Sequence, residues 1–478
     1  MELYRACRRT CLGFALCLML AGQIHAAPLN EQAVARAEAG ALQYLLDHMA
    51  EYHSDGDYYE VGGDLLRLQP AGKGARFVPS FELPAPDPAA GASAKDEPVS
   101  VYDVLTKYKR VFVYDLAVET CALVLAGKRE EARGLLLALE SVQLPDGSLP
   151  FSFNAGGDNF MNYSYLRSGS IAWAGYAAVF WERETGDHSF RTFASRIAKW
   201  LLDQQVPGES DRDYRAGLPL GGYGQWATDY SSLVKGRREW ACTEHAIDSY
   251  FFLRLYANTA PAGDPSRVYC LQAADRIKRA LVERLWVESK DGFGRFYQGV
   301  DRQQLNMGKA LDCASWGALF LLAIGETAKA EAAVRYAEAT FATTFRPSAP
   351  PAVGSVQLYR PYAGKNDEIE WDDYPDLVWA EGSLGVALAY LRLGRRDKFD
   401  AIVTDVLKLC AVPGDPATGV RYARYQQDLR GHRGGDIGTR DFIKDFTRAP
   451  SAMCTAWLVL VLESVAKEPN LNKFWGPD

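Results

Sequence analysis

The hydrophobic pattern of this chain repeats a pair of helical segments about six times. Each copy has an apolar segment, a glycine, and then a segment with charged residues at helical spacing. The clearest copy is residues 168–205, with Gly186 at its turn. A glycine just past the end of a helix favours the left-handed backbone that terminates helices. The same order of apolar segment, glycine and charged segment recurs at Gly127, Gly263, Gly325 and Gly394. The pattern therefore predicts repeated helical hairpins.

The repeat predicts twelve helices in two classes. Six are apolar almost all round, as buried inner helices must be, whereas the six return helices have a polar face. Inner helices are expected to begin near Val113, Ser168, Cys242, Ala310, Asp376 and Ser451. Return helices are expected near Arg129, Ser189, Pro265, Ala328, Arg396 and, for the twelfth, Glu31. Six hairpins can close into one ring, so we predict that residues 27–478 form a single all-α domain of this kind.

The long connections of the predicted ring all join a return helix to the next inner helix. They span residues 141–167, 206–241, 286–309, 343–375 and 412–450. They are therefore expected on one rim, while the opposite rim has short glycine turns. Long loops on one face of a helical ring indicate the functional face. A further segment rich in proline, glycine and alanine, residues 53–112, is predicted to be a loop.

The first residues have the composition of a secretory signal. Three arginines precede the apolar run 12–21, and a small-residue cleavage motif ends at Ala26. The apolar run is about half of the roughly 20 residues that a membrane span requires, so an anchor is the less favoured alternative. We therefore predict that residues 1–26 are a signal peptide and that the protein is periplasmic or secreted.

Charge and motif content exclude several classes of protein. A net charge of −7 and a pI near 5.6 predict no basic surface for nucleic acid. After signal removal no segment is long and apolar enough for a membrane span. The chain lacks the GxSxG, Walker, GxGxxG and HExxH motifs, so neither a cofactor nor a metal is expected. The acidic segment 367–373 leaves calcium as an alternative. Nothing indicates an obligate oligomer, so a monomer is expected.

Six of the nine cysteines lie outside the predicted signal. They are Cys121, Cys242, Cys270, Cys313, Cys410 and Cys454. Five of them fall inside or at the ends of apolar helices, where cysteine commonly behaves as a small hydrophobic residue. Export would permit disulfides, but six cysteines over this length do not form a disulfide scaffold.

Polar residues concentrate where the inner helices begin, on the same rim as the long connections. They include Asp115, Arg167, Glu244, His245, Asp248, Asp312, Asp373 and Glu381. Carboxylates at helix N-termini can simply cap the helix, an alternative that applies to Asp312 and Asp376. Glu244 and Asp248 are different, because they lie one turn apart on a helix whose other residues are largely apolar. Two carboxylates at the mouth of a buried helix suggest a function.

Glycoside hydrolysis uses such a pair. One carboxylic acid protonates the leaving oxygen, while a second carboxylate activates water or attacks the sugar. Burial near aromatic rings can raise the pKa of one group and leave the other ionised. Glu244 is the first candidate for acid or base, with Asp248 or Asp312 as its partner. In the alternative interpretation, Glu244 and Asp248 orient substrate and His245 has a structural hydrogen bond.

Aromatic residues of the long connections supply candidate sugar-stacking surfaces, with core packing as the alternative. These residues are Tyr223, Trp226, Trp240, Trp371 and Tyr374. Early inner-helix tryptophans are expected to pack the centre of the ring, with some lining the floor of its cup. They are Trp173, Trp316, Trp379 and Trp457. Arg167 has two interpretations, as a clamp for an acidic sugar or as a helix cap.

Four motifs, spread over nearly the whole mature chain, resemble the six-hairpin glycosidase superfamily of exported bacterial proteins. They are residues 113–117 (VYDLA), 167–173 (RSGSIAW), 240–250 (WACTEHAIDSY) and 311–319 (LDCASWGAL). The resemblance implies an (α/α)6 toroid that acts on poly- or oligosaccharides with carboxylate catalysts in its cup. The superfamily also contains polysaccharide lyases and sugar epimerases, and the chain matches no complete hydrolase signature.

We therefore expect a glycoside hydrolase that acts on an extracellular or periplasmic poly- or oligosaccharide. The predicted catalytic residues are Glu244, Asp248 and Asp312. The predicted substrate-binding residues are Asp115, Arg167, Tyr223, Trp226, His245, Trp371, Asp373 and Glu381. One alternative is a polysaccharide lyase that uses Arg167, His245 and Tyr163. Another is a non-catalytic glycan-binding or secretion-accessory protein.

Overall fold

The structure is a computed structural model of the chain. It describes residues 29–54, 58–61, 64–67, 70–82, 109–156, 165–208, 212–226, 233–347, 354–366, 369–425, 442–443 and 446–477. The predicted signal peptide and Tyr163 lie outside the described residues, as does part of the acidic segment 367–373.

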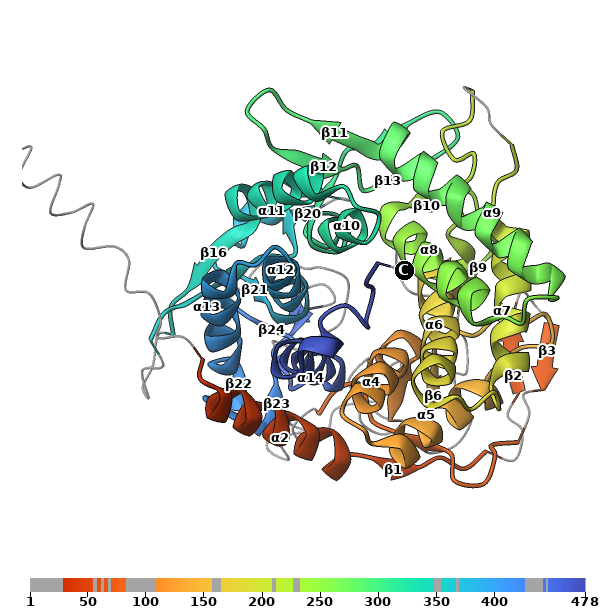
Figure 1. Cartoon of the computed structure of the whole chain (residues 1–478), viewed down its shortest axis with the longest axis horizontal. Helices are drawn as coiled ribbons and strands as arrows, with labels where there is room; N and C mark the ends of the chain where they lie inside the picture. The colour runs from red at the N-terminus through yellow and green to blue at the C-terminus, as the bar shows by residue number, and fades with distance from the viewer. Residues whose placement is uncertain are drawn as a thin grey trace, which may run out of the picture.

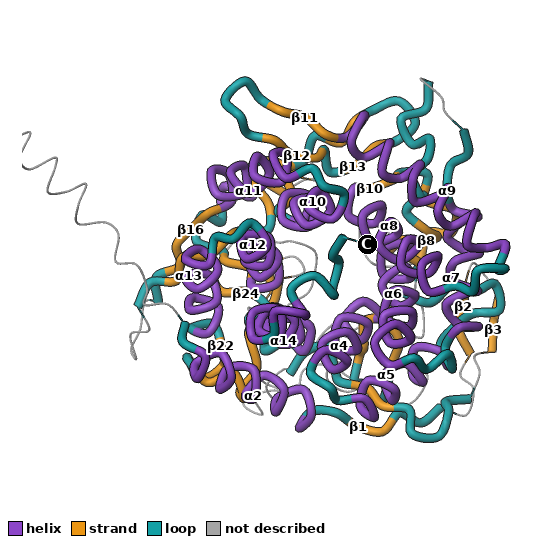
Figure 2. The backbone as a smooth tube through the Cα atoms, in the orientation of Figure 1, coloured by secondary structure: helices purple, strands orange, loops and turns teal. Residues whose placement is uncertain are grey.

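Twelve α-helices in the described residues form two concentric rings (Figures 1 and 2). The inner helices are α4 (Val113–Leu125), α6 (Ser168–Thr185), α8 (Thr243–Thr259), α10 (Asp312–Ala323), α12 (Ala380–Arg392) and α14 (Ala452–Ala466). The outer helices are α2 (Glu31–Asp47), α5 (Arg129–Ser141), α7 (Arg191–Gln204), α9 (Pro265–Ala280), α11 (Thr327–Phe341) and α13 (Arg396–Leu407). Three short helices are η1 (Leu281–Leu285), η2 (Trp371–Asp373) and η3 (Glu468–Asn470).

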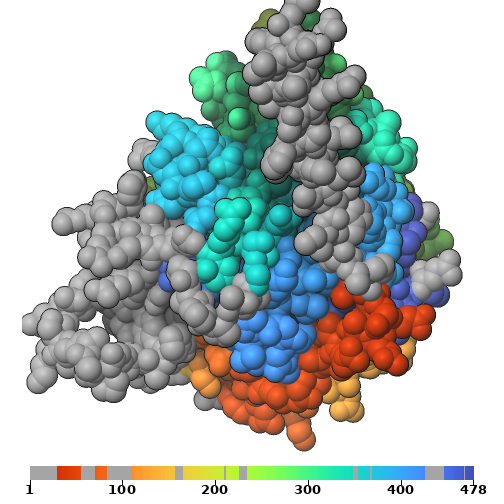
Figure 3. Space-filling view, turned by 90° about the vertical axis from the view of Figure 1, so that its left-hand side faces the viewer, coloured from red at the N-terminus to blue at the C-terminus, as the bar shows by residue number. Residues whose placement is uncertain are grey.

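The inner ring closes because each inner helix packs against the next. α4, α6, α8, α10, α12 and α14 follow one another in this order, and α14 packs back against α4. α2 packs on α14, so the first helix of the described chain completes the last hairpin. Figure 3 shows this closure from outside, with the red residues of α2 beside blue residues of the later chain. The predicted all-α (α/α)6 toroid is confirmed.

Burial explains which helices lie inside. α14 has the sequence AMCTAWLVLVLESVA, and its residues from Ala452 to Ser464 are all buried. α7 buries only the stripe that includes Phe193, Ile197 and Leu201. A helix that is apolar all round must be surrounded by protein, whereas a striped helix can have one face in water. In the described residues, no helix is long and apolar enough to cross a membrane.

The predicted glycine turns are right at four hairpins and wrong at the fifth. Gly127, Gly186, Gly325 and Gly394 have left-handed backbones, with φ of 76°, 73°, 84° and 72°. The α8–α9 turn is different, because α8 ends at Thr259 and the following residue, Ala260, has an extended backbone. The Asp264 side chain then accepts from the Ser266 N–H at 2.8 Å and caps α9. Gly263 therefore ends no helix, and an aspartate cap replaces the glycine signal.

Short antiparallel strands decorate the rim that has the long connections. Each inner helix has a lead-in residue or strand that pairs with the connection following its own hairpin. The pairs are β5 (Arg110–Phe112) with β6 (Ser152–Asn154), β7 (Leu166–Arg167) with β8 (Gly222–Trp226), β10 (Ala241–Cys242) with β13 (Gly299–Val300), β15 (Lys309–Ala310) with β18 (Tyr362–Ala363), and β21 (Val378–Trp379) with β24 (Ala423–Arg424). Ser451, before α14, bridges Phe81 in the same way.

These lead-in strands correct one predicted helix start. α12 begins at Ala380 rather than near Asp376, because Val378 and Trp379 belong to β21. The extended lead-ins hold the first turn of each inner helix at the mouth of the ring. The side chains of those first turns therefore converge there.

The other strand pairs lie within the connections. They are β1 (Ala50–Glu51) with β4 (Arg76–Phe77), β2 (Tyr58–Val61) with β3 (Asp64–Arg67), β9 (Leu233–Arg238) with β8, β11 (Trp286–Glu288) with β12 (Gly294–Phe296), β14 (Leu305–Asn306) with β13, β16 (Ala342–Phe345) with β17 (Val356–Tyr359), β19 (Lys365–Asn366) with β20 (Ile369–Glu370), β22 (Cys410–Val412) with β23 (Asp415–Val420), and β25 (Phe442–Ile443) with β26 (Phe446–Thr447). The six described cysteines are free.

Candidate active site

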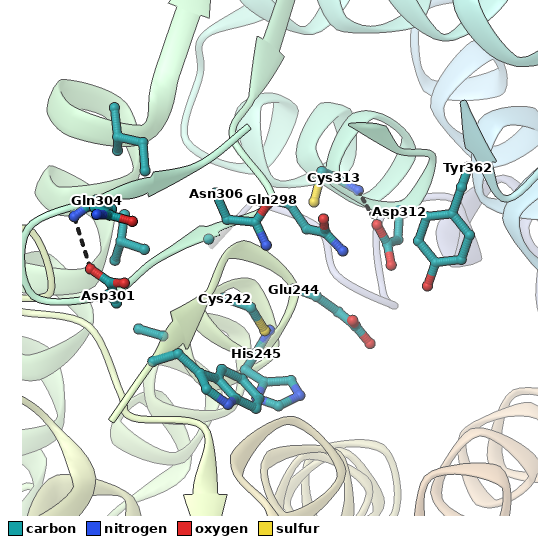
Figure 4. A pocket seen from close by; sticks show the side chains of 15 residues that line it. Cys242, Glu244, His245, Gln298, Asp301, Gln304, Asn306, Asp312, Cys313 and Tyr362 are labelled. Carbon is teal, nitrogen blue, oxygen red and sulfur yellow. Dashed lines mark hydrogen bonds between the residues drawn. The ribbon is translucent and has the colours of Figure 1, made fainter. Parts of the chain in front are cut away.

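Two adjoining cavities open at the rim where the inner helices begin. The central cavity has a volume of about 420 Å³ and lies over the middle of the inner ring. The side cavity has a volume of about 610 Å³ and extends between α8 and the strands β13 and β14 (Figure 4). Both are lined by Glu244, His245, Asp312 and Tyr362. These shared residues join the two spaces into one site.

Five acidic side chains line the central cavity. They are Asp115 on α4, Glu244 and Asp248 on α8, Asp312 on α10 and Glu381 on α12. Each belongs to the first or second turn of an inner helix, where backbone N–H groups stabilise negative charge. Among the described residues that line this cavity, none is lysine or arginine. The cavity is therefore an acidic cluster without a matching basic group.

Within this cluster, Asp312 is the acid whose charge most raises the pKa of Glu244. Figure 4 shows both side chains directed into the same space from α8 and α10. Burial raises the pKa of Glu244 well above its usual range, and the charge of Asp312 raises it further. Burial also raises the pKa of Asp312, but the N–H of Cys313 opposes this by donating to Oδ1 at 2.6 Å. Between the two acids, these effects favour keeping the proton on Glu244.

Asp248 lies one turn below Glu244 and is 2% exposed. Neither of its carboxyl oxygens has a hydrogen-bond partner within the described residues. Burial raises its pKa well above the usual range, because it disfavours the charged form. A buried polar group without a partner costs free energy, and a ligand hydroxyl that occupied the cavity would satisfy it.

Glu381 is held on another wall by a short chain of hydrogen bonds. The Trp457 indole N–H donates to the Tyr114 hydroxyl oxygen at 3.0 Å, and that hydroxyl donates to Oε1 of Glu381. Burial raises the pKa of Glu381 to about 8, while the bond from Tyr114 opposes the rise. Burial and Glu381 raise the pKa of Tyr114 well above its usual range, so Tyr114 stays a donor. Asp115 lies close by, and burial raises its pKa to about 7.

His245 is packed rather than charged. Burial and then the charge of Arg167 lower its pKa to about 3, so its ring is neutral. The ring lies 5.5 Å from Trp240, centroid to centroid, and against the backbone of α6. A Cβ on Gly169 would be 2.4 Å from Cδ2 of His245 and 2.8 Å from Oδ2 of Asp248. Gly169 is thus the reason that α6 and α8 approach closely enough to bury both side chains.

The Arg167 side chain binds backbone carbonyl oxygens of the two strands beside the site. Its guanidinium donates to the carbonyl oxygens of Leu166 at 2.9 Å and Gly224 at 2.8 Å. The same group lies over the Tyr165 ring, 4.1 Å from its centroid. These contacts join β7 to β8 behind the site. Arg167 is not among the residues that line the two cavities.

The remaining predicted binding residues do not line the cavities either. Trp371 is 1% exposed and packs behind Tyr362, with ring centroids 4.8 Å apart. Asp373 lies in η2 with an exposed side chain, and Tyr223 is partly buried on β8. Trp226 ends β8, and its side chain is outside the described part of the structure. Trp371 therefore supports the cavity wall behind Tyr362 and has no open face for a sugar.

Aromatic residues that the sequence did not single out form much of the central cavity. They are Phe81, Phe112, Tyr114, Phe151, Tyr165, Tyr362, Tyr422 and Phe446. Trp173, Trp316 and Trp379 also line it, as expected for part of the inner-helix tryptophans. Tyr114 was detectable, because it directly precedes Asp115 at the start of α4. Tyr362 was not, because nothing in its local sequence distinguishes it from other aromatic residues of the connections.

One group in the described chain has the residue types of a metal site. Cys242, Glu244 and His245 bring possible ligand atoms within 4.8 Å of one another. The Cys242 sulfur, however, already accepts from the His245 N–H at 3.4 Å. Burial raises the pKa of both the Cys242 thiol and Glu244, which opposes the deprotonation that metal binding requires. The arrangement fits proton chemistry better than metal binding.

No protein-family model and no curated protein matches this chain. A solved glycosidase variant has a TM-score of 0.51 and 12% identity, over 93% of this chain and 99% of that chain. A family 76 glycoside hydrolase from a bovine Bacteroides thetaiotaomicron strain has a TM-score of 0.49 and 8% identity, over 91% of this chain and 77% of that one. A bacterial glucoamylase complexed with acarbose has a TM-score of 0.47 and 11% identity, over 75% of this chain.

This chain spans about half of that glucoamylase, 49% of its length. At 12% identity, the likeness to the glycosidase variant with the TM-score of 0.51 establishes the fold alone. The resemblance predicted from the four sequence motifs therefore extends to the toroid. What the protein does has to be argued from its own site.

Proposed function

We propose that this protein is a glycoside hydrolase that cleaves a poly- or oligosaccharide in the periplasm or outside the cell. The observation that carries the proposal is the position of Glu244 at the junction of two cavities, in an aromatic and acidic pocket where burial and Asp312 raise its pKa. Sugars bind proteins through flat aromatic faces and through acceptors for their hydroxyl groups. The central cavity supplies both.

Glu244 is the proton donor in this proposal. A general acid must hold its proton at the working pH and face the leaving oxygen. Burial and the neighbouring carboxylate of Asp312 keep the proton on Glu244. Because Glu244 lies at the boundary between the cavities, the scissile bond of our proposal lies there, with one part of the substrate in each cavity.

The second carboxylate comes from another wall. Asp312 begins the neighbouring inner helix α10, and its charge is one of the causes that raise the pKa of Glu244. Asp312 therefore sets the pKa of Glu244 rather than acting across the sugar from it. Glu381 lies on α12 and accepts a hydrogen bond from Tyr114 of α4. In our proposal it is the group that activates water or attacks the sugar. Asp248 and Asp115 bind sugar hydroxyls.

The site favours a hydrolase over a polysaccharide lyase. A lyase requires a cation beside the uronate carboxylate, and the described lining residues of both cavities contain neither lysine nor arginine. Arg167 is occupied by backbone carbonyls, and His245 has its pKa lowered to about 3.

The test is the activity of the wild type and of Glu381→Gln against neutral and acidic polysaccharides, with reducing ends and ultraviolet absorbance followed together. We expect new reducing ends without absorbance, and a loss of about 100-fold or more in the variant. Absorbance from an unsaturated product would instead establish a lyase. Glycan binding without any product would establish a binding protein.

Export is the second part of the proposal and has a separate test. The signal-like segment 1–26 supports it. Expression of the full chain, cell fractionation and N-terminal sequencing of the product should give a periplasmic or secreted protein that starts near residue 27. A cytosolic protein with the segment still attached would contradict export without affecting the enzymatic proposal.

A further inference from the structure

The segment after α14 enters the centre of the inner ring. After η3 the chain runs inward, and in Figure 1 its end lies near the middle of the toroid. Phe474 and Trp475 are buried there, with 0% and 1% exposure. Trp475 has a φ of 48°, which is unfavourable for a bulky residue and indicates that its surroundings determine its placement.

Polar contacts tie this segment to opposite sides of the ring. On α12, the guanidinium of Arg392 donates to the carbonyl oxygens of Leu471 at 3.0 Å and Trp475 at 2.8 Å, and also to that of Phe474. On α6, the Tyr176 hydroxyl accepts from the Trp475 N–H at 3.0 Å. The segment therefore spans the hole instead of resting on one wall.

Its two rings meet the floor of the central cavity. Trp475 lies 4.8 Å from Trp173 and 6.0 Å from Trp316, measured between ring centroids. Phe474 stacks on Trp173 at 5.8 Å, and Trp475 stacks on Phe251 at 4.6 Å. Trp173 and Trp316 themselves line the central cavity. The floor tryptophans are thus sandwiched between the cavity above and the segment below.

A further cavity lies on the opposite side of this layer. It has a volume of about 260 Å³ and is lined by Tyr176, Phe251, Trp475, Gly476 and Pro477, among others. The rings of Phe474 and Trp475 separate it from Trp173 and Trp316. Without them, nothing in the described segment would divide this space from the floor of the central cavity.

We infer that residues 471–477 are a plug that closes the hole of the toroid, and that Phe474 and Trp475 are positioning residues for the floor tryptophans Trp173 and Trp316. The plug converts a ring with a central hole into a blind cup. Because no atom of the plug lines the central cavity, its effect on a sugar passes through the two floor tryptophans. The part of the inference that concerns kinetics rests on the proposed function.

The test compares Trp475→Ala with Trp475→Phe, and uses Trp200→Ala as the matched control. Trp200 is 6% exposed and lies on the outer helix α7, away from the floor. The readout is hydrogen exchange of the Trp173 and Trp316 indole N–H groups, followed by NMR with ¹⁵N-labelled tryptophan. We expect exchange at both positions to accelerate about 10-fold or more in Trp475→Ala, with recovery in Trp475→Phe and no change in the control.

The kinetic readout is KM against kcat on the glycan found for the wild type. We expect KM to rise about 10-fold in Trp475→Ala, as for the loss of one aromatic contact, with a smaller change in kcat because Glu244 and Glu381 lie on the walls. A folded Trp475→Ala with wild-type indole exchange would overturn the inference. If the alanine variant does not fold, Phe474→Leu decides by the same exchange measurement, because it removes a ring at similar volume. A wild type without glycan activity would overturn the proposed function alone, and indole exchange would still decide on the plug.

Discussion

Buried carboxylates occur at both ends of the inner helices, but they have opposite surroundings. At the rim with glycine turns, Glu182 of α6 is 5% exposed and forms ion pairs with Arg191 and with His188, the latter at 2.6 Å. Glu463 of α14 is fully buried, and Lys467 donates to it at 2.7 Å. At the loop rim, Asp248, Glu244 and Asp312 share one acidic cavity whose described lining has no lysine or arginine.

The difference separates structural from functional use of the same side chain. Glu182 and Glu463, the two buried carboxylates at the turn rim, each have a cation beside them, and this offsets the cost of burying a charge. A carboxylate that must hold and release a proton is left among other acids, which raises its pKa. The clustered acids of the loop rim therefore repel one another when ionised, whereas the carboxylates of the turn rim are neutralised by cations. Such a loss of stability is expected at a site that has been selected for activity.

The largest expected effect comes from comparing one carboxylate at each rim. Glu244→Gln should lower kcat/KM by about 1,000-fold, because the general acid is lost. Its melting temperature should be unchanged or higher, because a clustered acid has been removed. Glu182→Gln should have nearly wild-type kinetics and a lower melting temperature. Calorimetry and initial rates measure both quantities, and equal loss of activity in the two variants would break the comparison.

A second effect tests the value of the cation at the turn rim. Arg191→Met would leave Glu182 buried without its main partner, and we expect unfolding to become about 3 kcal/mol easier. Asp248→Asn is the counterpart at the loop rim and should not destabilise, because Asp248 has no cation to lose. Urea unfolding of both variants gives the free energies. Destabilisation of both by the same amount would show that the loop-rim acids also support the fold.

The smallest expected effect is a shift of the pH profile. Catalysis in our proposal needs Glu381 ionised and Glu244 protonated. Since the pKa of Glu381 is raised to about 8, kcat/KM should climb with pH until about pH 8, and the limb on which it falls should report the ionisation of Glu244.

Tyr114→Phe sharpens this test. It removes the hydrogen bond that lowers the pKa of Glu381, so the acidic limb of the profile should move to higher pH. In Tyr114→Phe the side chains of Trp457 and Glu381 are unchanged, and each loses only its hydrogen bond to the Tyr114 hydroxyl. A profile that peaks near pH 5, or an acidic limb that Tyr114→Phe leaves in place, would rule out Glu381 as the second carboxylate.

Much of the architecture was predictable because it depends on local periodicity. The runs around Ala174, Leu319 and Leu460 are apolar on every side, and such helices can only lie inside. The glycines at positions 127, 186, 325 and 394 ended helices as expected. Gly263 did not, because the aspartate cap of α9 made a glycine unnecessary there. The sequence did not predict the strands that precede the inner helices. Each is only two or three residues long and pairs with a connection that is distant along the chain.

The acidic character of the site was also predictable, whereas its pairing was not. Sequence spacing placed Glu244 and Asp248 one turn apart, but it could not show that Asp312, 68 residues further along the chain, lines the same cavity as Glu244 and raises its pKa. It assigned Arg167 and Trp371 to substrate, whereas the fold uses one to join β7 to β8 and packs the other behind Tyr362.

The sequence by itself therefore determined the ring: periodicity, burial and most turns are encoded within about 40 residues of one another. Only the tertiary structure decided which acids face each other, which aromatic rings remain open to a ligand, and that the segment after α14 closes the hole. The physical reason is that proton affinity and shape depend on neighbours in space. In a closed ring those neighbours come from hairpins that are far apart along the chain.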